Sequence, residues 1–368
     1  MFKNISIKNF RGITNLAVGG FRKVNLLIGK NNCGKTSALE ALFLASAPTN
    51  PELPLRINKF RGLGIIEEQF WHLLFNKFGD NHKIEIAVEL QQPEEKRSLK
   101  IEKIAGNKIP IGKPQNLKSH SLKLEPTETF LKVEESYSNM SSRTTGILLQ
   151  AMFQREESEP EKVVAMAQQV EDGIALDIQE KRENPFRAVF INSRTLFSDA
   201  AVRLNNLQIQ KETPLLVKVL QQVEPSLVNL SLGHQGVIYC DIGLDRLIPL
   251  QCLGDGISRL LAIILAIWDM KGGVIMIDEI ENGLYHSSLK ILWNAVLKFA
   301  QQFDVQIFTT THSMECVKAL ALSYPEIFQE TEDAIRVYRI EREEEKFRAV
   351  DYDYPTLKGS LEDGWEVR

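Results

Sequence analysis

Runs of apolar residues predict a strand, a loop and a helix at the start of the chain. Ile5 and Ile7 stand between polar neighbours, which is typical of a strand with one buried face. Residues 24–28 (VNLLI) predict a buried strand that ends at Gly29, and residues 36–45 favour a helix. The chain is therefore expected to begin with a β-strand, a glycine-containing loop and an α-helix in direct succession.

The middle of the chain is more polar and predicts a different kind of structure. Residues 50–62 carry prolines and glycine and indicate a loop, whereas residues 66–78 indicate a short helix. From residue 82 to about residue 135 apolar and polar residues alternate, which predicts an antiparallel β meander with one solvated face. The acidic stretch at residues 154–161 (QREESEPE) is expected to be a solvated loop.

The second half of the chain alternates between helical and strand patterns. Apolar residues recur on one helix face at Ile257, Leu260, Leu261, Ile264, Ile267 and Trp268. Residues 274–277 and 305–310 predict strands, and residues 289–300 predict the helix between them. Because strands and helices alternate, we predict an α/β fold with a mainly parallel sheet covered on both faces.

This pattern also suggests a domain organisation. The core is predicted to be discontinuous, formed by residues 1–50 and 186–368. Residues 51–185 are predicted to form a β meander, an antiparallel β lobe, together with a variable insertion that contains helices.

Composition and charge exclude several classes of protein. The formal net charge is -4, so no overall positive charge indicates a nucleic-acid or anionic-membrane partner. The longest apolar run, residues 260–268, is too short for a membrane span, and the N-terminus has no continuous apolar segment typical of a secretory signal. Four widely spaced cysteines form no CxxC pair, and we expect them to be reduced. A cytoplasmic protein is therefore expected.

Residues 29–36 (GKNNCGKT) match the phosphate-binding pattern GxxxxGK[ST]. Glycines in such a loop allow backbone N–H groups to surround a phosphate at the start of a helix. Lys35 would reach the β- and γ-phosphates of ATP, and the Thr36 hydroxyl would reach Mg²⁺. The residues expected to bind ATP here are Gly29, Asn31, Asn32, Cys33, Gly34, Lys35, Thr36 and Ser37.

A second pattern, residues 273–279 (GVIMIDE), is an apolar strand that delivers two carboxylates at its end. An acidic strand end alone is weak evidence, but after a phosphate loop it indicates a Walker B motif. Asp278 is then expected to hold Mg²⁺, directly or through water. Glu279 is expected to polarise the water that attacks the γ-phosphate.

Three further segments follow in a fixed order. Residues 253–256 (LGDG) with Arg259 open the apolar helix, residues 281–286 (ENGLYH) follow the carboxylate pair, and the last predicted strand leads to His312. Together with the N-terminal IKNFRGI, this set resembles the ABC-type ATPases of the SMC, RecF and OLD superfamily. The resemblance is closest to small OLD-like, AAA-type bacterial ATPases that lack the Toprim nuclease domain.

The resemblance implies a P-loop ABC-type ATPase head that works as a dimer. In that family Gly254, Asp255 and Gly256 would bind the γ-phosphate of ATP held by the other subunit, and His312 would sense the γ-phosphate. Arg11 would lie near the nucleotide. A water-positioning residue would follow the strand that ends at Ile191, at Asn192 or Ser193, with Gln69 as a competing candidate. Asp351 and Asp353 spell DxD, but too little sequence surrounds them to form a nuclease domain.

Two hypotheses for function follow from the resemblance. In the first, the chain is the dimeric ATPase component of a bacterial anti-phage defence system and controls a separately encoded nuclease or toxin. In the second, it is a RecF- or SMC-like ATPase of DNA repair or maintenance. Residues 96–123 give the second some local support, because they hold eight basic residues against Glu102, a net charge of +7. A lysine-rich hairpin is, however, more often simply a protected sheet edge. A transporter ATPase or an ATP-bound scaffold remains as a third class.

Overall fold

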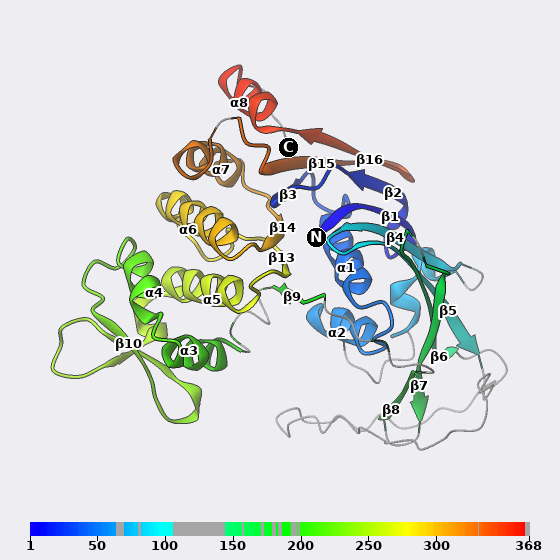
Figure 1. Cartoon of the computed structure of the whole chain (residues 1–368), viewed down its shortest axis with the longest axis horizontal. Helices are drawn as coiled ribbons and strands as arrows, with labels where there is room; N and C mark the ends of the chain where they lie inside the picture. Colours follow the sequence, from blue (N-terminus) through cyan, green and yellow to red (C-terminus); the bar gives the residue numbers. More distant parts are fainter. Residues whose placement is uncertain are drawn as a thin grey trace.

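The computed structural model contains two large β-sheets with helices between and beside them (Figure 1). It describes residues 1–63, 70–79, 82–105, 144–156, 158–170, 173–178, 182, 186–192, 197, 199–329 and 331–364. None of the helices within these ranges combines the length and the apolar character that crossing a bilayer requires.

The first sheet has six strands and forms the centre of the fold. In spatial order they are β16 (Lys346–Tyr352), β15 (Ile335–Glu343), β3 (Val24–Ile28), β14 (Gln306–Thr310), β13 (Val274–Ile277) and β9 (Ala188–Ile191). All neighbouring pairs are parallel except β15 with β16. Every residue of β3, β13 and β14 is buried, because both faces of a parallel sheet are covered. The predicted α/β class and mainly parallel core sheet are therefore confirmed.

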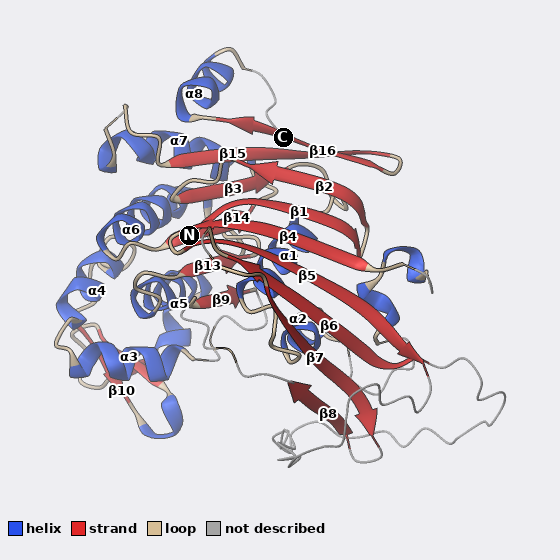
Figure 2. Ribbon diagram, turned by 45° about the vertical axis from the view of Figure 1, so that its right-hand side comes forward, coloured by secondary structure: helices blue, strands red, loops and turns tan. Residues whose placement is uncertain are grey.

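The second sheet is antiparallel and has seven strands (Figure 2). Their order is β2 (Ile13–Gly19), β1 (Phe2–Phe10), β4 (Ile84–Gln91), β5 (Glu94–Ala105), β6 (Thr144–Gln154), β7 (Glu161–Val170) and β8 (Gly173–Ile178). Strand β1 pairs with β4, so the predicted core and the predicted insertion both contribute to this sheet. The described part of the predicted meander forms β4 and β5, and residues 106–143 lie outside the described residues.

Helix α1 (Lys35–Ser46) lies between the two sheets. Its side chains share one apolar core with the inner faces of both sheets, for example with Ile7 of the seven-stranded sheet and Met276 of the six-stranded sheet. Eleven of its twelve residues are buried for this reason. The helix that follows the phosphate loop is therefore held from two sides.

The other face of the six-stranded sheet is covered by α5 (Asp255–Asp269), α6 (Leu289–Gln302) and α7 (Met314–Ile327), with α8 (Tyr354–Glu362) beside α7 (Figure 1). A small lobe packs on α5. It consists of α3 (Ala200–Ile209), α4 (Thr213–Leu220), β10 (Asn229–Leu232), β11 (Ile238–Asp241) and β12 (Ile248–Pro249). Helix α5 is buried along most of its length because it lies between the sheet and this lobe.

Two local predictions were wrong. The predicted loop at residues 50–62 contains helix α2 (Leu53–Phe60), whose Pro54 stands in the first turn, where a missing N–H leaves no helical hydrogen bond unmade. The described part of the helix predicted at residues 66–78 is two 3₁₀ turns, His72–Leu74 and Asn76–Phe78. Phe75 interrupts them because it adopts an extended conformation and forms a β-bridge with Phe10.

A buried charge cluster joins the seven-stranded sheet to α1. The Glu95 carboxylate accepts hydrogen bonds from Arg97 at 2.6 Å, from Arg182 at 2.7 Å and from Arg155 at 3.0 Å. Arg97 also donates to the carbonyl of Ser46, the last residue of α1, at 2.9 Å. One carboxylate thus connects β5, the turn after β6 and the segment before β9.

The charge of Glu95 is expected to stabilise the fold at neutral pH. Burial acts to raise the pKa of this carboxyl, but hydrogen bonds and charge from Arg182 and Arg97 lower it from 4.5 to about 2. The lowered pKa contributes about 3 kcal/mol above pH 4.5, and this contribution decreases as the pH falls toward 2. Urea unfolding should show Glu95→Gln destabilised by about 3 kcal/mol at pH 7 and by roughly half as much at pH 3.

Glu94→Gln is the matched control because Glu94 is the exposed neighbour on the same strand. It should change the free energy of unfolding by less than about 0.5 kcal/mol. A Glu95→Gln penalty that is the same at both pH values would contradict the electrostatic explanation.

Candidate nucleotide-binding site

The phosphate loop connects β3 to α1 and depends on its two glycines. A Cβ at Gly29 would lie 2.4 Å from the carbonyl oxygen of Ile340, and Gly34 has φ of 100° at the start of α1. Lys35 donates from Nζ to the carbonyls of Gly29 at 2.8 Å and Lys30 at 2.9 Å. The pKa of Lys35 lies below its usual value, because the effect of burial is larger than the opposing effects of Cys33 and Asp278. The lysine therefore lies inside the loop, where the phosphates of a nucleotide would be bound.

Three parallel strands bring oxygen ligands together at their carboxyl ends. Thr36 Oγ1 donates to Asp278 Oδ1 at 2.9 Å, and Thr310 Oγ1 donates to the same oxygen at 2.7 Å. Mg²⁺ prefers hydroxyl, carboxylate and water oxygens, and usually takes only one or two protein carboxylates. Thr36 and Asp278, predicted as metal ligands 242 residues apart, are thus adjacent and of the chemical type that Mg²⁺ requires.

Glu279 and His312 lie beside this pair. Glu279 has φ of 51°, and its N–H donates to Thr310 Oγ1 at 2.8 Å. His312 Nε2 lies 3.6 Å from Glu279 Oε1, and both side chains are partly exposed, 38% and 45%. The backbone N–H of His312 donates to Glu281 Oε1 at 2.8 Å. Both side chains are therefore accessible to solvent at the carboxyl ends of β13 and β14.

The LGDG segment forms the N-terminus of α5. Gly254 has φ of 100° and ψ of 164°, a conformation that favours glycine, and Gly254 and Asp255 are exposed. Unpaired N–H groups at such a helix start favour anions. The segment packs against the one after β13: a Cβ at Gly256 would lie 3.5 Å from Leu284 Cδ2 and 3.7 Å from the carbonyl oxygen of Gly283.

Arg11 occupies a buried ion pair. Its Nε lies 2.5 Å from Glu40 Oε2, and its guanidinium also donates to Asn58 Oδ1 at 3.0 Å. Burial lowers the pKa of Arg11 to about 10 despite the charge of Glu40. Asn192 donates to the carbonyl of Phe60 at 3.1 Å, whereas Ser193 and Gln69 lie outside the described residues. The Arg11 side chain contacts α1, α2 and the 3₁₀ turn at His72–Leu74, and its role near a nucleotide stays a prediction.

Arg61, which no sequence motif marks, shares Glu40 with Arg11. Arg61 donates to both carboxylate oxygens of Glu40, at 2.7 and 3.0 Å, and to Ser37 Oγ at 3.4 Å. Its side chain is 39% exposed. No local pattern marks this arginine, because its partners belong to α1, more than twenty residues earlier in the chain.

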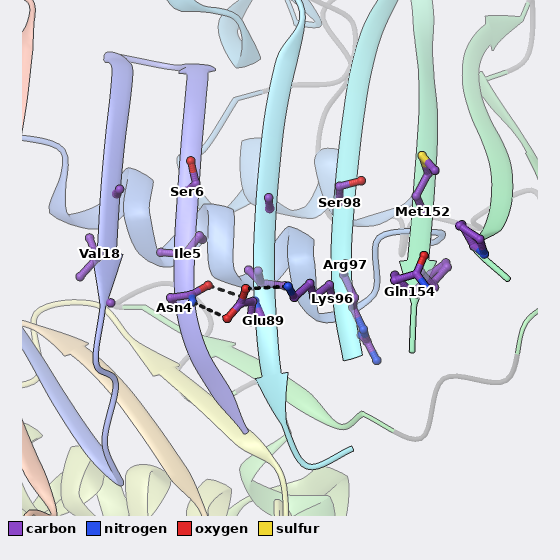
Figure 3. A pocket seen from close by; sticks show the side chains of 16 residues that line it. Asn4, Ile5, Ser6, Val18, Glu89, Lys96, Arg97, Ser98, Met152 and Gln154 are labelled. Carbon is purple, nitrogen blue, oxygen red and sulfur yellow. Dashed lines mark hydrogen bonds and ion pairs between the residues drawn. The ribbon is translucent and has the colours of Figure 1, made fainter. Parts of the chain in front are cut away.

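The described part of the basic segment carries paired charges. Lys96 lies 3.5 Å from Glu89, and Lys100 lies 3.2 Å from Glu102. A pocket of about 610 Å³ lies on the outer face of the seven-stranded sheet. Figure 3 shows Lys96 and Glu89 facing each other in this pocket. Lys103 donates to the carbonyl of Phe78 at 3.0 Å. Four further lysines of the segment, Lys108, Lys113, Lys118 and Lys123, lie outside the described residues. These contacts do not favour a uniformly positive DNA-binding surface.

The DxD residues have local structural partners. Asp351 lies 3.3 Å from Arg336, and Asp353 caps α8 by accepting a hydrogen bond from the N–H of Thr356 at 3.0 Å. Hydrogen bonds from the side chain and then from the backbone N–H of Thr356 lower the pKa of Asp353. Both carboxylates thus have roles in the fold that require no metal.

Comparison with known proteins gives two family matches. The family described as "AAA ATPase domain" matches residues 1–184, and the family described as "AAA domain, putative AbiEii toxin, Type IV TA system" matches residues 155–317. A protein named ATP/GTP phosphatase from Helicobacter pylori (strain ATCC 700392 / 26695) is 24% identical over 337 residues, which cover 87% of each chain.

Solved structures that align with this chain include SMC head domains. The SmcHead bound to the C-winged helix domain of ScpA aligns at a TM-score of 0.49 and 10% identity, over 98% of this chain and 99% of that chain. The SMC head domain from Thermotoga maritima aligns at a TM-score of 0.42 and 10% identity, over 95% and 98%.

Proposed function

Because this chain belongs to the AAA ATPase domain family and is an ATPase, we propose that it works as a dimer of ABC-type heads. Two copies would enclose ATP between the phosphate loop of one and residues 254–256 of the other. The observation that carries the proposal is that one chain provides groups suited to both halves of such a site. These halves are the Lys35, Asp278 and Glu279 cluster and the exposed N-terminus of α5.

Each residue of the cluster has a distinct task in this proposal. Lys35 and the loop N–H groups bind the β- and γ-phosphates, and Thr36 and Asp278 would hold Mg²⁺. When bound, the ion supplies positive charge that neutralises the phosphate oxygens. Glu279 accepts a proton from water as the water oxygen bonds to the γ-phosphorus and the bond to the β–γ bridging oxygen breaks. His312 contacts the γ-phosphate, and ADP and phosphate leave.

The dimer can be tested with Gly256→Asp. This change places a carboxylate where the γ-phosphate held by the partner would lie, and like charges repel. The new Cβ meets no atom closer than 3.5 Å, so the fold should tolerate the substitution. We expect the variant to bind ATP at its own phosphate loop but to sediment as a monomer with ATP and to lose hydrolysis by at least about 100-fold.

Gly359→Asp is the matched control, since a Cβ on this residue of α8 would meet nothing within 4 Å. It should dimerise with ATP as the parent does. A parent chain that stays monomeric with ATP while it hydrolyses ATP would contradict the composite site.

We further propose that the dimer is the ATPase component of an OLD-like bacterial defence system that controls a separately encoded nuclease or toxin. Support comes from the second matched family, whose description names a toxin of a type IV system. The test is affinity purification of parent and Glu279→Gln from the native host, combined with phage plaque assays. A nuclease or toxin should copurify in an ATP-dependent manner, and its deletion should abolish protection. Protection by this chain alone would contradict the proposal.

A further inference from the structure

Arg259 joins the N-terminal part of α5 to the segment that carries Glu279. Its guanidinium donates to three successive carbonyl oxygens, those of Asp278 at 3.4 Å, Glu279 at 2.5 Å and Ile280 at 3.3 Å. The side chain is buried, and Arg259 follows Gly254 by only five residues. A single side chain thus links the exposed helix start to the end of β13.

The backbone that Arg259 holds is unusual. Successive residues of a strand alternate in direction, so three successive carbonyls converge on one guanidinium only where the strand has ended in a turn. Glu279 provides that turn with φ of 51°, a left-handed conformation that is strained for a residue other than glycine. Charge-assisted hydrogen bonds to the carbonyls on either side of this residue stabilise the turn.

The same segment is held from the opposite side. Thr310 Oγ1 accepts the Glu279 N–H at 2.8 Å, and the N–H of Ile280 donates to the Thr310 carbonyl at 3.1 Å. Arg259 and β14 therefore hold the two edges of the turn. The direction of the Glu279 side chain depends on both, because it leaves the backbone at the strained residue.

We infer that Arg259 is a positioning residue for hydrolysis, which fixes the turn at Glu279 so that its carboxylate meets the attacking water within the same chain. The inference deepens the proposed function and rests on it. A merely structural arginine would lower stability and ATP affinity together, whereas a positioning residue lowers kcat and leaves ATP binding intact.

The first experiment separates these effects with Arg259→Ala and Arg259→Lys. We expect kcat to fall by about 100-fold in Arg259→Ala, as for a misplacement of about 1 Å, with KM and the Kd for ATP within about threefold of the parent. Arg259→Lys should retain more activity, because an ammonium can still donate to part of the carbonyl set. Added guanidinium ion should restore Arg259→Ala at least about fivefold and should not restore Glu279→Gln.

The second experiment asks in which chain Arg259 acts, using mixtures with Lys35→Ala. In a mixed dimer with a Lys35→Ala chain, only the other chain binds ATP. Hydrolysis then requires Glu279 of that ATP-binding chain together with residues 254–256 of the Lys35→Ala chain. A Gly256→Asp chain in this mixture should regain activity because its own Glu279 is intact. An Arg259→Ala chain should not, because its own Glu279 is misplaced.

The outcomes separate the two proposals. If the Gly256→Asp mixture stays inactive, the composite site of the proposed function is wrong. If that mixture is active and the Arg259→Ala mixture is equally active, Arg259 does not act on Glu279 of its own chain and the inference fails. It also fails if folded Arg259→Ala keeps kcat within threefold of the parent, or loses kcat and ATP affinity in proportion.

Discussion

Glu279→Gln is expected to hydrolyse ATP about 100- to 10,000-fold more slowly than the parent. The amide has the shape of the carboxylate but cannot take the proton from the attacking water. The Lys35 ammonium and the Thr36 hydroxyl are left unchanged, so ATP should remain bound. Phosphate release should show the lost turnover, and sedimentation with ATP should show a dimer that persists because the γ-phosphate is not removed.

Glu326→Gln on α7 is the matched control, since this exposed carboxylate pairs with Lys290 on α6. It should keep the hydrolysis rate of the parent within about twofold. If Glu279→Gln hydrolyses ATP as fast as the parent, Glu279 is not the base, and a different group must accept the proton.

Lys35→Ala is expected to abolish measurable ATP binding. The Lys35 ammonium is buried in the loop, where removing its charge-assisted bonds to phosphate should cost at least about 3 kcal/mol, a more than 100-fold increase in Kd. Calorimetric titration with ATP measures the loss directly, and phosphate release should fall to background.

Lys30→Ala provides a comparison within the same loop, because Lys30 carries the same charge on an exposed side chain. It should raise the Kd by no more than about threefold, since exposed charges are screened by solvent. Equal losses in both variants would indicate that overall charge, rather than the position of Lys35, governs binding.

The predictable part of the site consists of contiguous residues. Residues 29–36 form a loop because a buried strand ends at Gly29 and a helix starts at Lys35, and both signals are local. The carboxylate pair was equally visible, since four apolar residues precede Asp278. The alternation of strands and helices along the chain also predicted that the core strands are mainly parallel.

Secondary-structure predictions from local patterns were wrong where a contact with a distant residue determines the backbone conformation. Pro54 and its neighbours indicated a loop, yet the segment is helical and places Asn58 against Arg11. Phe75 interrupts a predicted helix because it pairs with Phe10, which is sixty-five residues earlier in the chain. Propensity over a short window contains no information about such partners.

The sequence by itself therefore determined the nucleotide chemistry of this protein. The phosphate loop, the carboxylates at the end of β13 and the glycine start of α5 are each defined by residues adjacent in the chain. Only the tertiary structure decided which side chains support them: Arg61 with Glu40, Arg259 with the carbonyls around Glu279, and Arg97 of the Glu95 cluster with the end of α1. The physical reason is that the role of a guanidinium is recognisable only when its acceptors are known, and these acceptors come from distant segments that meet upon folding.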